Sequence, residues 1–196
     1  MEVDFEHLVA GYIENEIGIS EHFLSDGLSE HLASNLLLLY EDNEFAQAGI
    51  GNDGFLQYSQ LIRKDKIYWL DKNHNDPYEN LFFEKMDAFV DYLNATCFVN
   101  IQSYEFHYSL YEPNDFYARH IDQFKDNASR QYSMVSYLNP NWQEKDGGEL
   151  LVYQSGSSQK IAPAQGKTVF FKSSVLEHEV LITNKRRMSI AGWLKQ

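Results

Sequence analysis

The sequence predicts an α+β fold in which helices come first and a strand-rich half follows. Apolar residues recur at helical spacing along much of residues 1–95, whereas from residue 96 onward short alternating runs are separated by Gly, Asn, Pro and Ser. Helices grouped before strands are typical of this class, because alternation of the two would instead build a parallel sheet. The length of 196 residues suits one domain, spanning residues 1–196 without a repeat or linker.

The first helix is expected over residues 4–16, where apolar side chains return every three or four positions. Gly18 is expected to end it, and residues 19–24 are predicted to form a short strand.

Two further helices are predicted from capping signals and periodicity. Ser25 is a good N-cap for a helix over residues 27–40, whose apolar stripe faces the core and comprises Leu28, Leu32, Leu36 and Leu37. Pro77 precedes a helix over residues 78–93, which is predicted to bury Leu81, Phe82, Met86, Phe89 and Val90.

Gly49, Gly51 and Gly54 lie within six residues and indicate a flexible loop. They also spell GxGxxG, the pattern of dinucleotide-binding turns. We reject a dinucleotide site because no parallel strand precedes these glycines and no βαβ unit follows them.

The second half is predicted to be built from short strands at residues 98–111, 134–138, 150–153, 168–171 and 188–193. Many short strands with turn residues between them favour a double-stranded β-helix, or jelly-roll, core over residues 96–196. Residues 1–95 would then supply mainly helical support and the glycine-rich loop.

Composition places few limits on function but several on location. Hydrophobic residues make up 43% of the chain and aromatic residues 15%, as in a globular protein. There is no run of 18 apolar residues, so no membrane span is expected. The acidic start lacks the basic region of a secretory signal, and Cys97 is the only cysteine, so no intrachain disulfide is possible. These features favour the reducing cytoplasm.

The net charge of −13 is unevenly distributed along the chain. Residues 1–50 hold eleven Asp and Glu and no Lys or Arg, which leaves −2 for the other 146 residues. Such a surface would repel nucleic acid and acidic membranes, so neither is an expected partner. It could attract a basic protein, although a solvated acidic surface that aids solubility is the simpler interpretation.

His120 and Asp122 are two residues apart, so on a β-strand their side chains would leave from the same face. With His178 from a distant strand they would give two imidazoles and one carboxylate, a set that suits non-haem Fe(II) and leaves positions open for a co-substrate and O₂. The alternatives are a surface histidine in a charged loop for His120 and a structural histidine for His178, because a lone His-x-Asp pair also arises by chance.

Arg187 follows His178 by nine residues, in the apolar run near the end of the chain. A guanidinium is always charged and can bind a carboxylate through two parallel hydrogen bonds. A metal triad followed by a buried arginine could therefore hold a keto acid by both ends. Lys185 and Arg186 compete for this role, but they are expected at a turn that faces water, whereas Arg187 shares a strand face with Ser189, Ala191 and Trp193.

Taken in order, the motifs form one string: HxD at 120–122, SYLN at 136–139, GGEL at 147–150, VFFKS at 169–173, HEV at 178–180, then Arg187 and Trp193. The string resembles the 2-oxoglutarate- and iron-dependent prolyl hydroxylases, specifically the type that hydroxylates hypoxia-inducible factor in animals and its bacterial relatives. Residues 62–69, IRKDKIYW, also resemble the I-R-x-D-K-I-x-W segment of that family, so the likeness runs from about residue 60 to 193.

The resemblance implies that the chain uses Fe(II), with 2-oxoglutarate as co-substrate and O₂ as oxidant. It implies that Arg187 and Tyr137 hold the distal carboxylate of 2-oxoglutarate and that Tyr111 lines the same pocket. The loop that follows Tyr111 is one residue longer here than in the family. Ala191 stands where some relatives have threonine, so a polar contact to the co-substrate is either missing or supplied by Ser189. Core packing is the alternative for both tyrosines.

The resemblance also implies a substrate groove. Arg130 matches an arginine that holds the peptide, with surface charge as the alternative, and Trp193 matches an aromatic residue that lines the groove. Arg63 and Asp65 match a pair that fixes a mobile lid, here expected over residues 49–64.

The expected function is hydroxylation of a prolyl residue in a protein substrate, coupled to decarboxylation of 2-oxoglutarate. An oxygenase acting on another side chain, a free amino acid or a small metabolite is the first alternative, because the metal residues cannot separate these substrates. A non-catalytic binding module is the second, since a fold does not fix a function. The presence of His120, Asp122, His178 and Arg187 together argues against that module.

Overall fold

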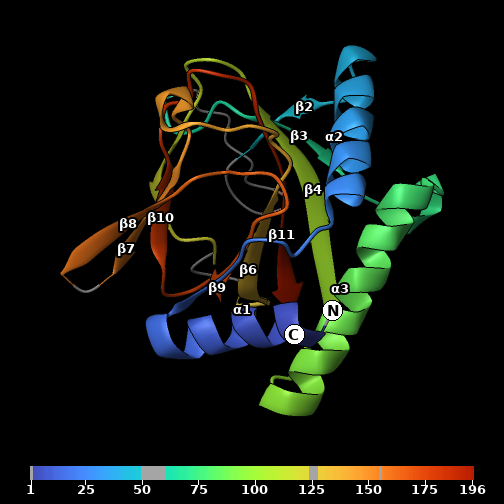
Figure 1. Cartoon of the computed structure of the whole chain (residues 1–196), viewed down its shortest axis with the longest axis vertical. Coiled ribbons are helices and arrows are strands. Elements are labelled where there is room, and N and C mark those ends of the chain that lie inside the picture. Colours follow the sequence, from blue (N-terminus) through green and yellow to red (C-terminus); the bar gives the residue numbers. More distant parts are fainter. Residues whose placement is uncertain (1, 50–60, 124–127, 155) are drawn as a thin grey trace.

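The computed structural model describes residues 2–49, 61–123, 128–154 and 156–196 (Figure 1). Within these ranges the chain forms α1 (Glu2–Asn15), α2 (Asp26–Glu41), α3 (Pro77–Cys97) and two short 3₁₀ helices, η1 (Lys72–His74) and η2 (Glu144–Asp146). The strands are β1 (Ile17–Ser20), β2 (Ala46–Gln47), β3 (Lys66–Trp69), β4 (Ser103–Tyr111), β5 (Tyr117–His120), β6 (Arg130–Tyr137), β7 (Leu150–Gln154), β8 (Ser157–Ile161), β9 (Thr168–Lys172), β10 (Glu177–Val180) and β11 (Arg187–Lys195).

The strands form two antiparallel sheets, so the predicted mixture of helices and short strands is confirmed. The larger sheet has seven strands in the order β1-β9-β6-β11-β4-β3-β2, and the smaller has four in the order β5-β10-β7-β8. In Figure 1, α1 lies across the lower edge of the strands, α3 runs beside them, and the β7–β8 hairpin projects to the left.

Two helices begin at side-chain caps. Ser25 accepts a hydrogen bond from the Leu28 amide at 3.3 Å, which confirms its prediction as the N-cap of α2. Asp76 caps α3 by accepting from the amides of Tyr78 at 2.9 Å and Glu79 at 2.8 Å. Pro77, at the first position of α3, lacks only an amide that a helix start leaves unpaired.

The predicted boundary between the first helix and strand is wrong. The helix ends at Asn15, Glu16 turns the chain with φ of 62°, and the strand is Ile17–Ser20 rather than 19–24. Gly18 lies inside β1, where it pairs with Phe170 of β9, and the backbone of α1 packs closely against it. A Cβ atom at Gly18 would lie 1.9 Å from the carbonyl oxygen of Leu8. This glycine therefore serves close packing and does not end the helix.

The buried face of α3 also differs in part from the prediction, and Val90, which was predicted to be buried, is only partly buried. Leu81 is 47% exposed, whereas Phe83, which the pattern did not select, is buried. Phe82, Met86 and Phe89 are buried as predicted. Leu81 lies on the water-facing side of the helix, so its apolar character gave a misleading signal.

The expected strand at 98–111 begins only at Ser103. Phe98 and Asn100 have φ of 54° and 56°, which interrupts an extended chain, and the Phe98 side chain is exposed. The sequence analysis did not predict β2, β3 or β8, and it expected strands at His120 and His178, where β5 and β10 lie, without giving their bounds. Strand β8 reads SSQKI, a mostly polar run that pairs only with β7 at the sheet edge.

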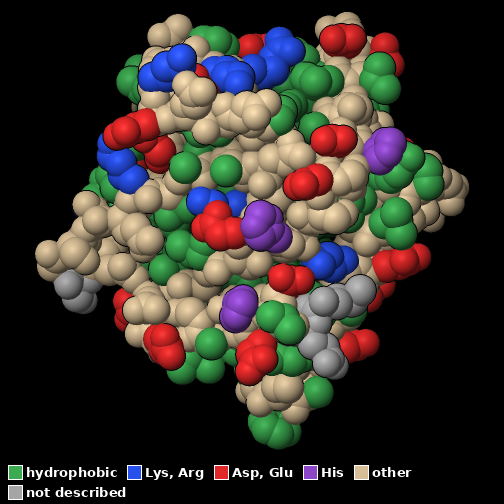
Figure 2. All heavy atoms as spheres, viewed as in Figure 1, with side chains coloured by type: hydrophobic (Ala, Val, Ile, Leu, Met, Phe, Trp, Pro, Cys, Tyr) green, Lys and Arg blue, Asp and Glu red, His purple; other side chains and the backbone are tan. Residues whose placement is uncertain are grey.

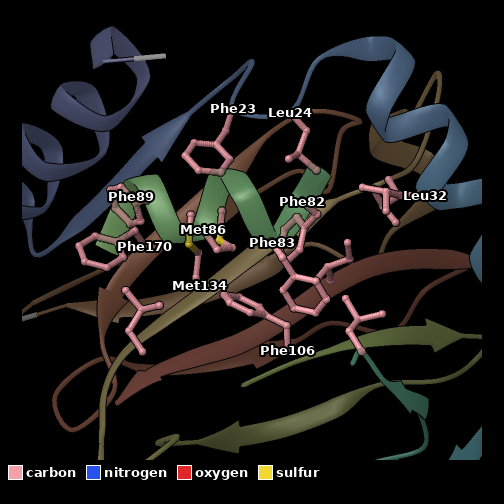
Figure 3. Close-up of a cluster of buried hydrophobic side chains, with 14 of the residues drawn as sticks. Phe23, Leu24, Leu32, Phe82, Phe83, Met86, Phe89, Phe106, Met134 and Phe170 are labelled. Carbon is pink, nitrogen blue, oxygen red and sulfur yellow. The ribbon is translucent and has the colours of Figure 1, made fainter. Parts of the chain in front are cut away.

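The larger core lies between the helices and the outer face of the seven-stranded sheet (Figure 3). There Phe82, Met86 and Phe89 of α3 pack with Phe106 of β4 and Phe170 of β9. A second cluster fills the space between the two sheets, with Tyr111, Tyr137, Val152, Phe171 and Val180 among its members.

Alternation along β4 decides which residues face which side. Phe106, Tyr108 and Leu110 belong to the helix-facing core, whereas the residues between them line a cavity on the inner side: Glu105, His107, Ser109 and Tyr111. The same period of two divides β11, where Met188, Ile190 and Leu194 face the core.

Charged side chains are unevenly distributed over the face of the molecule seen in Figure 2. Most of the Lys and Arg side chains visible in Figure 2 gather along its upper edge, and Asp and Glu are spread over the rest of this face. Among the described residues, no helix has the length and apolar character needed to cross a membrane.

Candidate active site

A cavity of about 810 Å³ is lined by residues of both sheets. Alternate residues of β11 run along it from Arg187 through Ser189, Ala191 and Trp193 to Lys195. Eight residues of strand at roughly 3.3 Å each make this wall about 26 Å long. We call the part near Arg187 the inner end and the part near Lys195 the outer end.

His120, Asp122 and His178 meet at the cavity wall. One ligand atom from each lies within 4.8 Å of those of the other two. Asp122 Oδ1 is 3.3 Å from His120 Nε2 and 3.7 Å from His178 Nε2. Bonds of about 2 Å from three donors to one ion require separations of this size, so the three side chains could hold a metal ion.

Both imidazoles are oriented by the backbone. His120 Nδ1 lies 2.8 Å from the Ala118 carbonyl oxygen, and His178 Nδ1 lies 3.0 Å from the carbonyl oxygen of Leu176. A carbonyl oxygen only accepts, so Nδ1 carries the proton and Nε2 keeps its lone pair for a metal. Burial lowers the pKa of His178, which keeps its ring neutral at neutral pH.

Asp122 reaches the site differently from the prediction. His120 is the last residue of β5, and Asp122 follows the strand in a bend, so the two do not share a strand face. Ser133 on β6 holds the carboxylate by donating to Oδ2 at 2.6 Å. Burial acts to raise the pKa of Asp122, whereas this hydrogen bond, and His178 and His120 whenever they are protonated, act to lower it; the net direction is below the usual value.

Arg187 forms the inner end and is 2% exposed. Its Nε donates to the Gly148 carbonyl oxygen at 2.8 Å, and Nη1 donates to Ser189 Oγ at 3.4 Å. Within the described ranges no Asp or Glu pairs with this guanidinium. By contrast, Arg186 is partly exposed and bound to Glu112 at 2.7 Å, outside the cavity.

Two tyrosines stand beside Arg187. The guanidinium carbon lies 4.9 Å from the ring centre of Tyr111 and 5.2 Å from that of Tyr137. The Tyr137 hydroxyl is buried and has no hydrogen-bond partner in the part of the chain that the structure describes. Burial raises the pKa of Tyr137 to about 12, so the hydroxyl keeps its proton and can donate it to an anion.

Arg130 and Trp193 lie together at the outer end. The Arg130 guanidinium carbon is 3.4 Å from the centre of the Trp193 ring. Glu105 accepts from Arg130 at 3.0 Å and from Lys195 at 2.9 Å. The sequence-predicted substrate residues are thus adjacent to each other and about 20 Å along the sheet from Arg187 by strand length.

Arg63 and Asp65 form a buried ion pair with two parallel contacts, of 2.8 Å and 2.7 Å. Arg63 also donates to the carbonyl oxygen of Gly49 at 3.2 Å, so the pair joins both ends of the segment expected to be a lid. Residues 50–60 of that segment lie outside the described residues. The Arg63 guanidinium stacks on Tyr117, which in turn stacks on the His120 ring at 3.6 Å.

Sequence reasoning missed several side chains of the site: Glu105, His107 and Tyr117 line the cavity, and Ser133 holds Asp122. Glu105 and His107 have the same parity along β4 as Tyr111, so strand alternation could have identified them. Ser133 has the parity of Tyr137 on β6. Tyr117 gave no such signal, because the strand expected at His120 had no predicted bounds and β5 is only four residues long.

Comparison with known proteins identifies relatives of the chain. A model of the 2OG-Fe(II) oxygenase superfamily matches residues 106–195, the range that holds the three candidate metal ligands and Arg187. Prolyl 3-hydroxylase OGFOD1 of Xenopus laevis is 35% identical over 75 residues, 33% of this chain. That match spans only 15% of the frog protein.

Solved structures match over nearly the whole chain. A Pseudomonas putida prolyl-4-hydroxylase is 30% identical with a TM-score of 0.89, and the match covers 98% of both chains. A prolyl hydroxylase from Trichoplax adhaerens, solved with a peptide fragment of hypoxia inducible factor, is 25% identical with a TM-score of 0.84. That match covers 97% of this chain and 88% of the other. The chain therefore belongs to the 2OG-Fe(II) oxygenase superfamily and, within it, to the prolyl hydroxylase family.

Proposed function

We propose that this chain is an Fe(II)- and 2-oxoglutarate-dependent dioxygenase that hydroxylates a prolyl residue of a protein or peptide. One observation carries the proposal. A buried arginine without an acidic partner in the described residues lies at the inner end of a cavity whose wall also bears two histidines and an aspartate.

A buried guanidinium without a counter-ion is costly, and a carboxylate ligand removes that cost. Arg187 and the unpartnered hydroxyl of Tyr137 would bind the distal carboxylate of 2-oxoglutarate, with Ser189 and Tyr111 beside them. Arg186 is unsuited to this role because it is already bound to Glu112 outside the cavity.

His120, Asp122 and His178 would hold Fe(II), since two neutral imidazoles and one carboxylate on one side of an ion suit this metal. Members of the superfamily use Fe(II), 2-oxoglutarate and O₂, which supply the oxidising chemistry that protein side chains lack. The chain would orient the co-substrate through Arg187 and the peptide through the outer end.

The length of the cavity supports a peptide as substrate. Beyond the metal residues the wall continues past Trp193 to Lys195, which leaves room for residues on either side of a proline. The two solved relatives are prolyl hydroxylases, and the one from Trichoplax adhaerens contains a peptide. Arg130 and Trp193 would contact the peptide, while Arg63 and Asp65 would hold the ends of the 49–64 segment.

An oxygenase acting on another side chain, a free amino acid or a small metabolite is the less favoured function. A free amino acid would occupy only the space near the metal and would leave the outer end unused.

The arrangement of sheets is also part of the proposal. The two antiparallel sheets with a site between them support a double-stranded β-helix core over residues 96–196, with residues 1–95 as support in one domain. A cytoplasmic location and the absence of nucleic-acid or membrane partners stay predictions from composition.

The test is turnover of unstructured peptides that each hold one central proline, in a library with varied flanking residues. The chain is incubated with Fe(II), 2-oxoglutarate and O₂, and succinate and the peptide masses are measured. We expect at least one peptide to gain one oxygen atom on proline, with succinate formed in equal amount. Efficient turnover of free proline, with no peptide modified, would favour the small-molecule alternative.

Replacing Arg187 by Ala or Lys should raise the 2-oxoglutarate concentration needed for half-maximal succinate formation at least tenfold. A charge-assisted contact in a desolvated pocket is worth roughly 2–5 kcal/mol. Lys keeps the positive charge but cannot donate the two parallel hydrogen bonds of a guanidinium. Arg186→Ala is the matched control, one residue away, and should change the requirement little. The reverse pattern would move the anchor to Arg186.

A further inference from the structure

The outer end of the cavity is bordered by a network of three charged side chains on three adjacent strands. Arg130 lies at the start of β6, Lys195 at the end of β11 and Glu105 on β4, and β11 lies between the other two strands. All three side chains line the cavity. Because alternate β4 residues face the cavity, Glu105 occupies the outer position of the row that ends at Tyr111 beside Arg187.

Glu105 binds both cations at once. Its Oε1 accepts from Arg130 Nε at 3.2 Å and Nη2 at 3.0 Å, and its Oε2 accepts from Lys195 Nζ at 2.9 Å. The carboxylate therefore fixes the guanidinium through the two nitrogens of one edge and separates two like charges that would otherwise repel each other.

The guanidinium held in this way lies on Trp193. Its central carbon is 3.4 Å from the ring centre, and Trp193 is the residue directly opposite Glu105 in the β4–β11 register. The indole Nε1 of Trp193 is buried without a hydrogen-bond partner among the described residues. The network thus holds in contact the two side chains that would meet a peptide.

We propose that Glu105 is a positioning residue for substrate: it holds Arg130 flat on Trp193 and so preforms the outer end of the cavity. The inference rests on the proposed function only in that a peptide occupies this end. Arg130 and Lys195 hold the pKa of the Glu105 carboxyl below its usual value despite partial burial, so the network stays charged at neutral pH.

The competing interpretation is that the three charges only stabilise the pairing of the strand ends. The positioning role and this structural role predict different effects when Glu105 is replaced. A positioning residue should affect the peptide KM and leave kcat, metal affinity and peptide-free decay of 2-oxoglutarate intact. If Glu105 only stabilises the strand ends, its loss should lower the stability of the protein and impair kcat, metal affinity and 2-oxoglutarate decay together.

The kinetic test compares Glu105→Gln with Glu112→Gln. The second variant breaks another Glu–Arg ion pair, with Arg186, that is more exposed and lies outside the cavity. With the most active peptide of the proline library as probe, we expect Glu105→Gln to raise the peptide KM about tenfold and to change kcat less than about twofold. Glu112→Gln should change neither. Equal effects of the two variants, or loss of kcat with unchanged KM, would overturn the proposal.

A double substitution asks whether Glu105 acts through Arg130. If it does, Glu105→Gln combined with Arg130→Gln should raise the KM no more than Arg130→Gln alone, because the positioned group is already gone. Multiplicative effects would show that Glu105 acts independently, which contradicts the proposed role.

A fluorescence experiment tests the contact between Arg130 and Trp193 without any substrate. The chain has three tryptophans, and replacing Trp69 and Trp142 by Phe leaves Trp193 as the only one. In that background Glu105→Gln should increase quenching of Trp193 emission by acrylamide, because the guanidinium no longer covers the ring. If no peptide is turned over but quenching increases, the proposed function fails and the network stands. Unchanged quenching would refute the proposal that Glu105 holds Arg130 on Trp193, whatever the substrate is.

Discussion

Asp122 combines three contacts that make it suited to bind a cation. It lies partly buried beside two imidazoles, and a serine hydroxyl on β6 fixes one of its oxygens. Of the three candidate ligands it alone carries a charge when both rings are neutral, so it should contribute most to holding a divalent ion.

We predict that Asp122→Ala weakens metal binding at least about tenfold. Two neutral imidazoles remain, but the compensating negative charge and one ligand are lost. Titration with Co²⁺, followed by its visible absorption, measures the affinity without need for turnover. Glu177→Gln is the control, because Glu177 precedes His178 but pairs at the surface with Arg119. Wild-type affinity in the Asp122 variant would remove this residue from the metal site.

At the scale of elements, strand alternation builds the core and the cavity from the same segments. In β11 one set of residues packs against the helices and the other set runs from Arg187 to Lys195 along the cavity. A helix that shifted on the outer face of the seven-stranded sheet would therefore also displace the strands that line the cavity. The tightest approach of a helix to this sheet that involves a glycine is between α1 and β1 at Gly18.

Gly18→Ala should destabilise the chain by roughly 1–3 kcal/mol, because the added Cβ would lie 1.9 Å from the Leu8 carbonyl oxygen and would push α1 away. Gly27→Ala is the matched control. That glycine lies in the first turn of α2 with nothing within 4 Å of an added Cβ, so the change should be neutral or slightly stabilising. Urea denaturation of both variants measures the difference. Equal stabilities would mean that α1 can shift at little cost.

At the scale of the whole molecule, a buried histidine links stability to pH. His107 is 3% exposed, its Nδ1 lies 3.1 Å from the Tyr108 carbonyl oxygen, and its ring contacts Trp69 and Trp193. Burial lowers its pKa to about 4, and the positive charge of Arg63 adds to the effect.

The unfolded chain binds a proton at His107 near pH 6.5, whereas the folded chain does so only near pH 4. Between these values the unfolded state holds more protons, so stability falls as the pH falls. We predict that wild type loses on the order of 3 kcal/mol more unfolding free energy than His107→Phe between pH 6.5 and 4. Urea denaturation at both pH values tests this, with His7→Gln on α1 as an exposed control. Identical pH dependence of wild type and His107→Phe would contradict it.

The sequence by itself determined the features that depend on local chemistry. Ser25 caps α2 because its hydroxyl reaches an amide three residues on, and apolar periodicity marks most of α3. The order of the motifs from His120 to Trp193 identified the family, since it combines several residue types at fixed spacings. The parity of Arg187, Ser189 and Trp193 followed from their positions on one strand.

Only the tertiary structure decided the rest. Gly18 looked like a helix end but accommodates a neighbouring backbone, and Leu81 looked like core but faces water. Asp122 reaches His178 from a bend after β5, and β8 forms from polar residues because β7 offers an edge. Glu105 lies beside Arg130 and Lys195, which are 25 and 90 residues away. The physical reason is common to all of these: local spacing sets the direction of a side chain, whereas pairing between distant strands decides what that side chain meets.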